Sequence, residues 1–275
     1  MSTADKIFKE MCKDILTKGV WDTDYDVRPR WEDGTPAHTI KKFGIVNRYN
    51  LQESFPILTL RKTNFRAAVD ELLWIWQKKS NNVNDLNSRI WDSWADETGS
   101  IGKAYGYQLG IKHKYKEGEF DQVDRVLYDL KNNPASRRIL TNIYNFQDLH
   151  EMHLYPCAYS MTFNVSGNKL NAILNQRSQD VLAANNWNVV QYSILVHMMA
   201  QVSGLVAGEL VHVIADAHIY DKHVPIIEEL IEMEEHEPPT LEIDNIDDFY
   251  KFTVDSFRLI NYQYNPFKVK VPIAV

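Results

Sequence analysis

The sequence predicts a single domain of mixed α/β or α+β type that spans residues 1–275. Three observations support this prediction. Helix-like and strand-like segments alternate along the second half of the chain, and no Gly/Ser-rich linker or low-complexity tract divides it. In addition, 44% of the residues are hydrophobic, which is enough material for a substantial core.

The first half of the chain begins with an amphipathic helix, in which Cys12 shares an apolar stripe with its neighbours and which ends at Gly19. A segment rich in Asp, Arg, Pro and Gly follows and predicts a long loop. A later apolar helix carries one carboxylate, Glu71, beside leucine and tryptophan residues. In chain order, the predicted elements are a helix over 5–18, a loop over 21–38, strands over 44–50 and 57–60, and a helix over 65–76.

The second half alternates strands and helices more regularly. Ser166-Gly167-Asn168 is typical of a hairpin turn between two strands. The acidic run over 228–237 is most simply a solvated face. In chain order, the predicted elements are strands over 138–144, 158–165 and 169–175, a helix over 188–202, a strand over 210–214, and a segment over 216–234 that runs into a helix.

Composition and charge exclude several classes of protein. A formal net charge of −7 argues against a general binder of nucleic acids or anionic membranes, which normally carries a basic excess. Two cysteines cannot build a disulfide framework, and the charged start of the chain does not resemble a secretory signal. The most apolar run, 189–202, is interrupted by polar residues and is too short to span a bilayer. We therefore expect a cytoplasmic globular protein without a membrane segment.

Several familiar motifs are missing from the sequence. Gly102, Gly106 and Gly110 are evenly spaced, but they do not have the form of a dinucleotide-binding loop. His218 and His223 have no third ligand nearby, so no metal site is expected. The sequence has neither a Walker phosphate loop nor the Gly-x-Ser-x-Gly elbow of a serine hydrolase.

Arginine residues are the first candidates for chemistry. Arg177 precedes Ser178, and a planar guanidinium beside a hydroxyl suits the oxygens of a phosphate monoester. Each charged hydrogen bond contributes roughly 1.5–3 kcal/mol, so three or four would hold a small phosphorylated ligand. Ordinary surface salt bridges are the alternative for any single arginine. The other candidates are Arg28, Arg30, Arg137 and Arg138.

Cys157 is the second candidate, because it follows a proline at the start of an apolar strand. A cysteine in this position is more often a packing residue than a nucleophile. A nearby arginine would lower the pKa of the thiol and raise the fraction of thiolate. A thiolate beside a phosphate-binding arginine indicates covalent attack on a small phosphorylated molecule. Cys12, by contrast, is expected to be a core residue.

The order and spacing of these residues resemble the thymidylate synthase family. The central motifs are Leu154-Tyr155-Pro156-Cys157, Gln176-Arg177-Ser178-x-Asp180, Asn188 and Asp216-x-His218-x-Tyr220. Further matching segments are Glu71-Leu72-Leu73-Trp74, Ile90-Trp91-Asp92-x-Trp94, Ala104-Tyr105-Gly106-x-Gln108, Ser136-Arg137-Arg138 and Pro272-Ile273-Ala274-Val275. Together they cover nearly the whole chain. The resemblance implies a thymidylate-synthase-like domain built on a large mixed β-sheet flanked by helices.

The resemblance also implies an activity, namely the methylation of deoxyuridylate (dUMP) to thymidylate with 5,10-methylenetetrahydrofolate and without a metal. Cys157 would add to C6 of the pyrimidine, so that C5 becomes nucleophilic enough to attack the methylene group. Arg177 would bind the phosphate and help to keep Cys157 ionised. Glu71 would organise water and proton transfer around O4, and Tyr105 would assist removal of the C5 proton.

By the same resemblance, other residues would bind the nucleotide. Asn188 would match O4 and N3–H of uracil with its amide, and His218 with Tyr220 would hold the sugar 3′-hydroxyl. Gln179, Asp180 and Ile219 lie in the same motifs and are also expected to bind substrate. The expected phosphate ligands are Arg28 (with Arg30 as its competitor), Arg177 and Ser178, together with Arg137 of the partner subunit and Arg138 of the partner subunit in a homodimer.

The folate side of the site is implied in the same way. Asp180 would bind the pterin and take part in catalysis, and Trp91 and Trp94 would line the cofactor pocket. The last two residues, Ala274 and Val275, would close over the folate and exclude water from hydride transfer. The sequence departs from the family pattern at several positions, and among them Asn64 and Ala158 stand where the family usually has histidine. Asn64 is kept among the expected folate-side residues.

Two other functions remain open from the sequence. A pyrimidine hydroxymethylase of the same superfamily would let water rather than hydride quench the methylene intermediate; Asn188 argues against a cytosine-specific form but not against one that acts on dUMP. A nucleotide-binding or RNA-binding regulator with the same fold is the non-enzymatic alternative. The expected function does not require nucleic acid.

Overall fold

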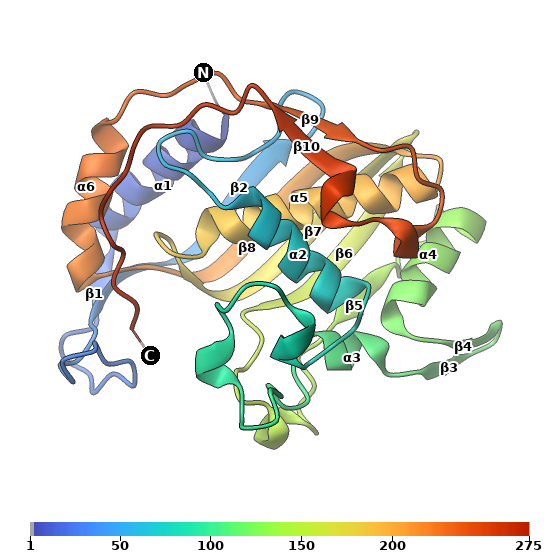
Figure 1. Ribbon diagram of the computed structural model, residues 1–275, viewed down its shortest axis with the longest axis horizontal. Helices are drawn as coiled ribbons and strands as arrows, with labels where there is room; N and C mark the ends of the chain where they lie inside the picture. Colours follow the sequence, from blue (N-terminus) through green and yellow to red (C-terminus); the bar gives the residue numbers. More distant parts are fainter. Residues whose placement is uncertain (1–2, 275) are drawn as a thin grey trace.

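The computed structural model describes residues 3–274, and within them six strands form one sheet in the order β1-β2-β8-β7-β6-β5 (Figure 1). The strands are β1 (Val20–Trp21), β2 (Thr39–Asn50), β5 (Leu140–Asn142), β6 (Ala158–Ser166), β7 (Lys169–Asp180) and β8 (Val206–Tyr220). β7 and β8 are parallel, whereas the other neighbours are antiparallel. Helix α5 (Asn185–Val202) connects the parallel pair, because parallel neighbours need a crossover connection.

The remaining elements surround this sheet. The helices are α1 (Thr3–Lys18), α2 (Phe65–Trp76), α3 (Gly106–Gly110), α4 (Gln122–Asn132) and α6 (Val224–Glu232). Two separate two-stranded sheets pair β3 (His113–Tyr115) with β4 (Gly118–Phe120) and β9 (Thr240–Ile243) with β10 (Phe257–Ile260). The 3₁₀ turns are η1 (Val83–Asp85), η2 (Asp92–Trp94), η3 (Leu149–Glu151), η4 (Asp221–His223), η5 (Phe249–Lys251) and η6 (Val254–Ser256).

One face of the sheet packs against α5 and α2, which lie across it (Figure 1). Tyr49, Leu210, Ala172 and Phe163 are direct partners across four strands and are all buried. The adjacent residues of these strands point to the opposite face. There, exposed apolar side chains occur on separate strands, including Val46 (54% exposed), Ile173 (39%) and Leu140 (50%). The two faces of the sheet therefore differ, because only one is covered by α5 and α2.

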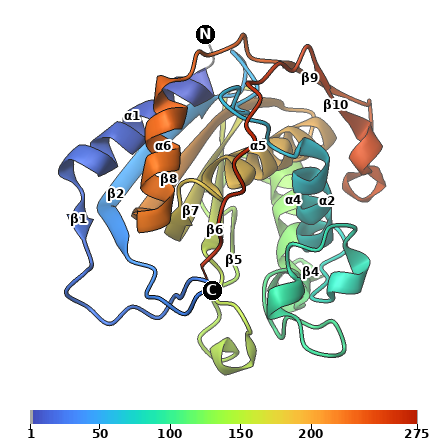
Figure 2. The ribbon, with the colours of Figure 1, turned by 60° about the vertical axis from the view of Figure 1, so that its left-hand side comes forward.

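A second apolar cluster lies where α1 and α6 pack beside each other against β2 and β8 (Figure 2). Cys12 belongs to this cluster and is completely buried, as expected for a core residue. Ile219 and Ala217 of β8 also point into it. This cluster fixes the ends of β7 and β8, from which many of the polar residues described below project.

The structure confirms the helices predicted over 5–18 and 65–76, which are α1 and α2, and it changes the boundaries of several other predicted elements. The predicted strand over 57–60 is wrong: the main-chain N–H groups of Leu58 and Thr59 donate to the side chains of Asn186 and Asp5, so this buried segment forms no ladder. The strand predicted over 138–144 is limited to β5. β7 and β8 are longer than predicted, and β8 continues to Tyr220 before α6 begins.

None of the helices within residues 3–274 is long and apolar enough to cross a membrane.

Candidate active site

A cleft of about 760 Å³ opens where the start of β6 and the ends of β7 and β8 meet α2, α5 and the C-terminal segment. A volume of this size is typical of a site for a small molecule. Most of the residues that the sequence predicts for the site line this cleft. They are Arg28, Glu71, Trp91, Trp94, Tyr105, Cys157, Arg177, Ser178, Gln179, Asp180, Asn188, His218, Tyr220 and Ala274.

Other predicted residues do not line the cleft. Arg137 and Arg138 are exposed and precede β5, so they are not strand residues. Asn64 is exposed and caps α2, where its side chain accepts a hydrogen bond from the Ala67 N–H at 3.3 Å. Ile219 is completely buried in the apolar cluster beside α1. Val275 lies outside the described residues. The binding roles of these five residues remain predictions.

Cys157 lies directly before β6, at the end of a loop that Arg177 of β7 holds in place. The guanidinium donates to the carbonyl oxygens of Tyr155 and Pro156 at 2.8 and 2.9 Å, and its Nη2 lies 3.7 Å from Cys157 Sγ. The Arg177 N–H also donates to the Cys157 carbonyl at 2.9 Å. Arg177 thus positions the thiol-bearing loop through its backbone and its side chain.

The electrostatic environment of Cys157 contains opposing effects. Burial raises the pKa of the thiol, while the charges of Arg177 and Arg28 and a hydrogen bond with Tyr105 act to lower it. Burial is the larger effect, so the thiol pKa is above its ordinary value. The sequence-based expectation that Arg177 favours the thiolate is correct in direction, but in the free protein the cation does not outweigh desolvation.

Tyr105 has an unusual backbone conformation, with φ 47° and ψ −107°, immediately before α3. A positive φ in a bulky residue costs about 1–3 kcal/mol and persists only where the surroundings impose it. The Tyr105 ring packs edge-on against Trp91 at 4.8 Å between centroids, and its Oη accepts a hydrogen bond from the Cys157 N–H at 3.3 Å. The strained residue is therefore in direct contact with the backbone of the thiol residue.

Glu71 projects from α2 into the cleft and is 5% exposed. Burial raises its pKa to about 7, although hydrogen bonds with Gln191, Trp91 and Trp187 favour the ionised form. Trp187 Nε1 donates to Glu71 Oε2 at 3.2 Å. A carboxyl group with a pKa near neutrality can both accept and release a proton at physiological pH.

Asn188 belongs to a chain of polar side chains that crosses the floor of the cleft. Gln176 Nε2 donates to Asn188 Oδ1 at 3.1 Å, and Asn188 Nδ2 donates to Gln191 Oε1 at 3.2 Å. Gln176 Oε1 in turn accepts from His212 Nε2 at 2.8 Å. Burial lowers the pKa of His212 to about 3, so its ring is neutral and Nε2 carries the proton. These contacts fix which side of the Asn188 amide donates and which accepts.

Asp180 is held at the end of β7 by backbone and side-chain donors. Its Oδ1 accepts from the N–H groups of Leu182 and Ala183, both at 3.0 Å, and lies 3.6 Å from His223 Nδ1. Burial opposes ionisation, but these donors outweigh it, and the pKa of Asp180 is lowered. His223 Nε2 also donates to the Pro272 carbonyl at 2.7 Å. One buried imidazole therefore joins the Asp180 region to the C-terminal segment.

The end of β8, which pairs with the end of β7 at Asp180 and His218, carries the residues predicted to bind the sugar. His218 Nδ1 lies 2.8 Å from Asp216 Oδ1, and its ring packs edge-on against Tyr220 at 5.2 Å. Arg28 lines the cleft. Arg30 does not, because its guanidinium binds the Val27 carbonyl and the Asp26 carboxylate within its own loop. The geometry therefore favours Arg28 over its competitor.

Several polar or aromatic residues that line the cleft were not predicted as site residues. They include Gln176, Trp187, Gln191 and Asp216. Gln191 follows Asn188 by three residues in a mostly apolar helix, which places both on one face. Asp216 precedes His218 by two residues on β8, so their side chains lie on the same face of the strand. These two spacings were detectable signals, whereas the contact between Trp187 and Glu71 depends on packing. Among residues 3–274 there is no group of three or more His, Cys, Asp or Glu side chains that could hold a metal ion.

Comparison with known proteins agrees with this geometry. A model of the thymidylate synthase family matches residues 6–275. The chain is 45% identical over 281 aligned residues to thymidylate synthase of Bacillus subtilis subsp. natto and equally to that of Bacillus phage phi3T, with complete coverage of both chains in each case. The solved structure of thermostable thymidylate synthase A from Bacillus subtilis matches with a TM-score of 0.95 at 43% identity, covering 98% of this chain and 99% of that one.

The fold class predicted from the sequence, a mixed sheet flanked by helices, is confirmed, and the family match identifies the chain as a methyltransferase. The chain belongs to the thymidylate synthase family.

Proposed function

We propose that this enzyme converts dUMP to thymidylate by reductive methylation, with 5,10-methylenetetrahydrofolate as the donor of both the one-carbon unit and the hydride. The observation that carries the proposal is the 3.7 Å approach of Arg177 Nη2 to Cys157 Sγ in a cleft that Glu71 and Asn188 also line. A thiol, an adjacent cation, a carboxyl group with a pKa near 7 and an oriented amide are the groups that this reaction needs.

The first step is covalent activation of the pyrimidine. The Cys157 thiolate forms a bond from Sγ to C6, and the C5–C6 π electrons move toward O4 to give an enolate with a nucleophilic C5. The raised thiol pKa means that little thiolate is present in the free enzyme. We infer that binding of the nucleotide and ordering of Arg28 and Arg177 around its phosphate favour the reactive geometry. Glu71 exchanges a proton with O4 through water, and Tyr105 assists departure of the C5 proton.

Asn188 recognises the base in this proposal. The contacts of its amide with Gln176 and Gln191 leave one N–H and one lone pair for a ligand, which match O4 and N3–H of uracil. His218 and Tyr220 hold the 3′-hydroxyl. Ser178 and Arg28 supply donors to the phosphate together with Arg177.

The aromatic residues of the cleft and Asp180 suit a folate. Trp91, Trp94 and Trp187 present aromatic surface for a pterin ring, and the ionised Asp180 accepts hydrogen bonds from ring N–H groups. When bound, 5,10-methylenetetrahydrofolate supplies the methylene group and then the hydride. The tryptophans and the segment containing Ile273 and Ala274 exclude water, which favours hydride transfer over hydroxylation.

We further propose that the enzyme is a homodimer with shared active sites. The sheet face that α5 and α2 leave uncovered carries exposed apolar residues, including Ile173 and Leu140. Two such faces packed together would bury this surface. Arg137 of the partner subunit and Arg138 of the partner subunit would then complete the phosphate site, which agrees with their exposed position before β5. The two unpaired cysteines support a cytoplasmic setting.

The products formed from dUMP and 5,10-methylenetetrahydrofolate test the proposal. We expect thymidylate and dihydrofolate in equal amounts, with dihydrofolate followed by its absorbance and the nucleotide identified by mass spectrometry. A 5-hydroxymethyl nucleotide with tetrahydrofolate would identify a hydroxymethylase instead. Absence of any product, with dUMP binding retained, would favour a regulatory protein.

A further inference from the structure

Helix α3 begins at Gly106 and ends at Gly110, and both glycines face the segment that follows α2. A Cβ atom on Gly106 would lie 2.7 Å from Ser80 N and 2.8 Å from the carbonyl carbon of Lys79, and one on Gly110 would lie 3.3 Å from Lys79 Cβ. Residues four apart share one face of a helix, so this face rests directly on Lys79 and Ser80. The absence of a side chain on Gly106 allows α3 to approach the Lys79–Ser80 backbone closely.

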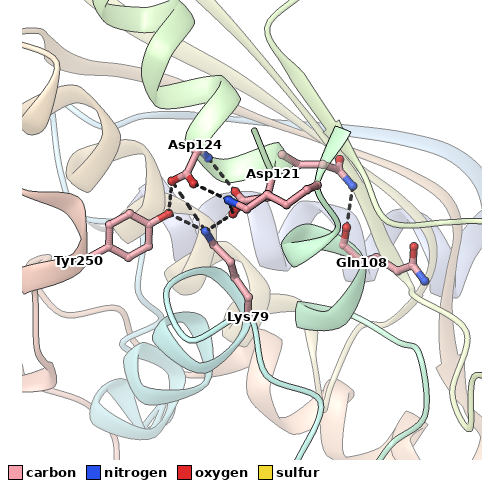
Figure 3. Close-up of polar contacts among 7 residues, drawn as sticks. Lys79, Gln108, Asp121, Asp124 and Tyr250 are labelled. Atoms are coloured by element: carbon pink, nitrogen blue, oxygen red, sulfur yellow. Dashed lines mark hydrogen bonds and ion pairs between the residues drawn. The ribbon is translucent and has the colours of Figure 1, made fainter. Parts of the chain in front are cut away.

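Lys79 is anchored by a network of carboxylates and a phenol (Figure 3). Its ammonium donates to Asp121 Oδ2 at 2.6 Å and to Tyr250 Oη at 2.7 Å, and the Tyr250 hydroxyl donates to Asp124 Oδ1 at 2.5 Å. The side chains of Lys79 and Asp121 are only 15% and 3% exposed. Asp121 also caps α4, so the network ties the end of α2 to a rigid element. Lys79 itself has a positive φ of 52°, a conformation that this anchoring maintains.

Tyr105 lies directly before α3 and so connects this packing contact to the cleft. The residue precedes Gly106 and has a positive φ, and its Oη contacts the Cys157 N–H. Any shift of the Lys79–Ser80 backbone would remove the surface on which Gly106 rests. The turn at Tyr105 could then relax toward an ordinary conformation, which would withdraw the phenol from Cys157.

We propose that Lys79 is a positioning residue for the reaction at Cys157, which acts by holding α3 and thereby the strained turn at Tyr105. This inference rests on the proposed function, because it concerns the rate of a step in which Tyr105 takes part. Lys79 lies outside the lining of the cleft, so its effect should fall on kcat more than on nucleotide binding.

The same network contains a matched control. Lys112 Nζ donates to the same Asp121 oxygen at 2.9 Å and to Asp124 at 3.2 Å, but its side chain is 56% exposed. Neither Gly106 nor Gly110 has Lys112 among the atoms nearest to an added Cβ. Substitution of either lysine removes a cation from the network, whereas only substitution of Lys79 disturbs the segment against which α3 packs.

The test compares Lys79→Met, Lys79→Arg, Lys112→Met and Gly106→Ala in the full-length enzyme. The measurements are kcat, KM for dUMP, release of tritium from 5-tritiated dUMP, and the melting temperature. For Lys79→Met we expect kcat and tritium release to fall about tenfold to a hundredfold, because a displacement near 1 Å costs on that order. KM should change less than about threefold, since uniform binding is kept. Lys79→Arg should recover most of the loss, and Lys112→Met should lower the melting temperature while keeping kcat.

Gly106→Ala probes the same contact from the other side, so it should reproduce the loss of kcat. Combined with Lys79→Met, it should produce less than the product of the two separate losses, because both act on one contact. Equal kcat losses in Lys79→Met and Lys112→Met would overturn the inference, as would a fully active, folded Gly106→Ala. If the unmodified enzyme formed no thymidylate, the proposed function would fail as well. An active enzyme with an unchanged Lys79→Met would defeat only this inference.

Discussion

The guanidinium of Arg177 approaches the thiol of Cys157, with Nη2 at 3.7 Å from Sγ, while it holds the thiol-bearing loop through two carbonyl groups. The cation acts to lower the thiol pKa, but burial raises it by more, so the thiol pKa is above its ordinary value. The fraction of thiolate therefore increases as the pH rises through this elevated pKa. The chemistry at Cys157 depends on the balance between these two effects.

This balance can be measured by alkylation. In a Cys12→Ser background, the rate of reaction with iodoacetamide should rise with pH along the ionisation curve of Cys157. Arg177→Met should move that curve to higher pH, because the largest stabilising charge is lost. Arg28→Met should move it less, and Arg30→Met, whose guanidinium binds its own loop, should leave it in place. Identical curves for the Arg177 and Arg30 variants would contradict the electrostatic account.

Cys157→Ser should fold and bind dUMP but lose nearly all turnover. A hydroxyl is a much weaker nucleophile than a thiolate near neutral pH, and the groups around the phosphate remain. Calorimetric titration with dUMP and an assay of dihydrofolate release check the two parts. Cys12→Ser is the matched control, since that thiol lies on α1 and is completely buried in the apolar cluster. Substantial activity in the Cys157 variant would rule out the covalent mechanism.

Glu71→Gln should stabilise the protein at alkaline pH while it abolishes turnover. The folded-state pKa of Glu71 is about 7, above its ordinary value of 4.5. Between these values the folded state binds more protons than the unfolded state, so the free energy of unfolding decreases as the pH rises. The difference corresponds to on the order of 3 kcal/mol, fully expressed above pH 7.

Urea denaturation at pH 5 and pH 8 tests the effect of Glu71. Relative to the unmodified enzyme, the Gln variant should gain stability between the two pH values. Because glutamine can still accept from Trp187, the hydrogen bond itself is kept as far as possible. The same stability difference at both pH values would show that Glu71 titrates normally.

Asn188→Asp should change the choice of base. A protonated or water-bridged carboxyl can match the N3 acceptor and 4-amino group of cytosine but loses the fit to uracil. We expect the ratio of kcat/KM for deoxycytidylate to that for dUMP to increase. Asn188 does not cap α5, because this helix begins at Asn185 with Ala184 at the N-cap. An unaltered ratio in a folded variant would exclude base recognition by Asn188.

Mixed dimers test the sharing of sites. Chains with Cys157→Ser and chains with Arg137→Ala and Arg138→Ala should each have little activity as homodimers. In a heterodimer, one site carries both defects and the other carries neither. Random mixing of equal amounts should therefore restore about a quarter of the sites. Demonstrated heterodimers without recovered activity would mean that these arginines do not act across the interface.

The sequence predicted the segments with strong local signals. The helix over 65–76 has an apolar period and an Asn cap, and the structure has a helix over the same residues. The segment over 57–60 was as apolar as a strand, but its N–H groups bond to Asp5 and Asn186, which are far away in the sequence. A local pattern cannot distinguish a ladder from such isolated side-chain acceptors.

For the candidate site, residue type and motif order identified most of the groups that line the cleft. They did not identify the contacts that orient these groups. The chain from His212 through Gln176 to Asn188 joins three elements, and the link from His223 to Pro272 joins residues 49 apart in sequence. The net effect on the Cys157 pKa was also inaccessible, because burial depends on the packing of the whole cleft.

The parallel pairing of β7 with β8 limits which insertions and deletions the protein can tolerate. Asp216 and His218 of β8 line the cleft, while Ala217 and Ile219, each of which follows one of them, are buried in the apolar cluster. Deletion of one codon in the connection between α5 and β8 would shift β8 by one residue and exchange these two sets. The apolar side chains of Ala217 and Ile219 would then enter the cleft. The carboxylate of Asp216 and the imidazole of His218 would enter the core. Length variation among descendants of this gene should therefore accumulate in exposed segments such as the β3–β4 hairpin, and spare residues 203–205.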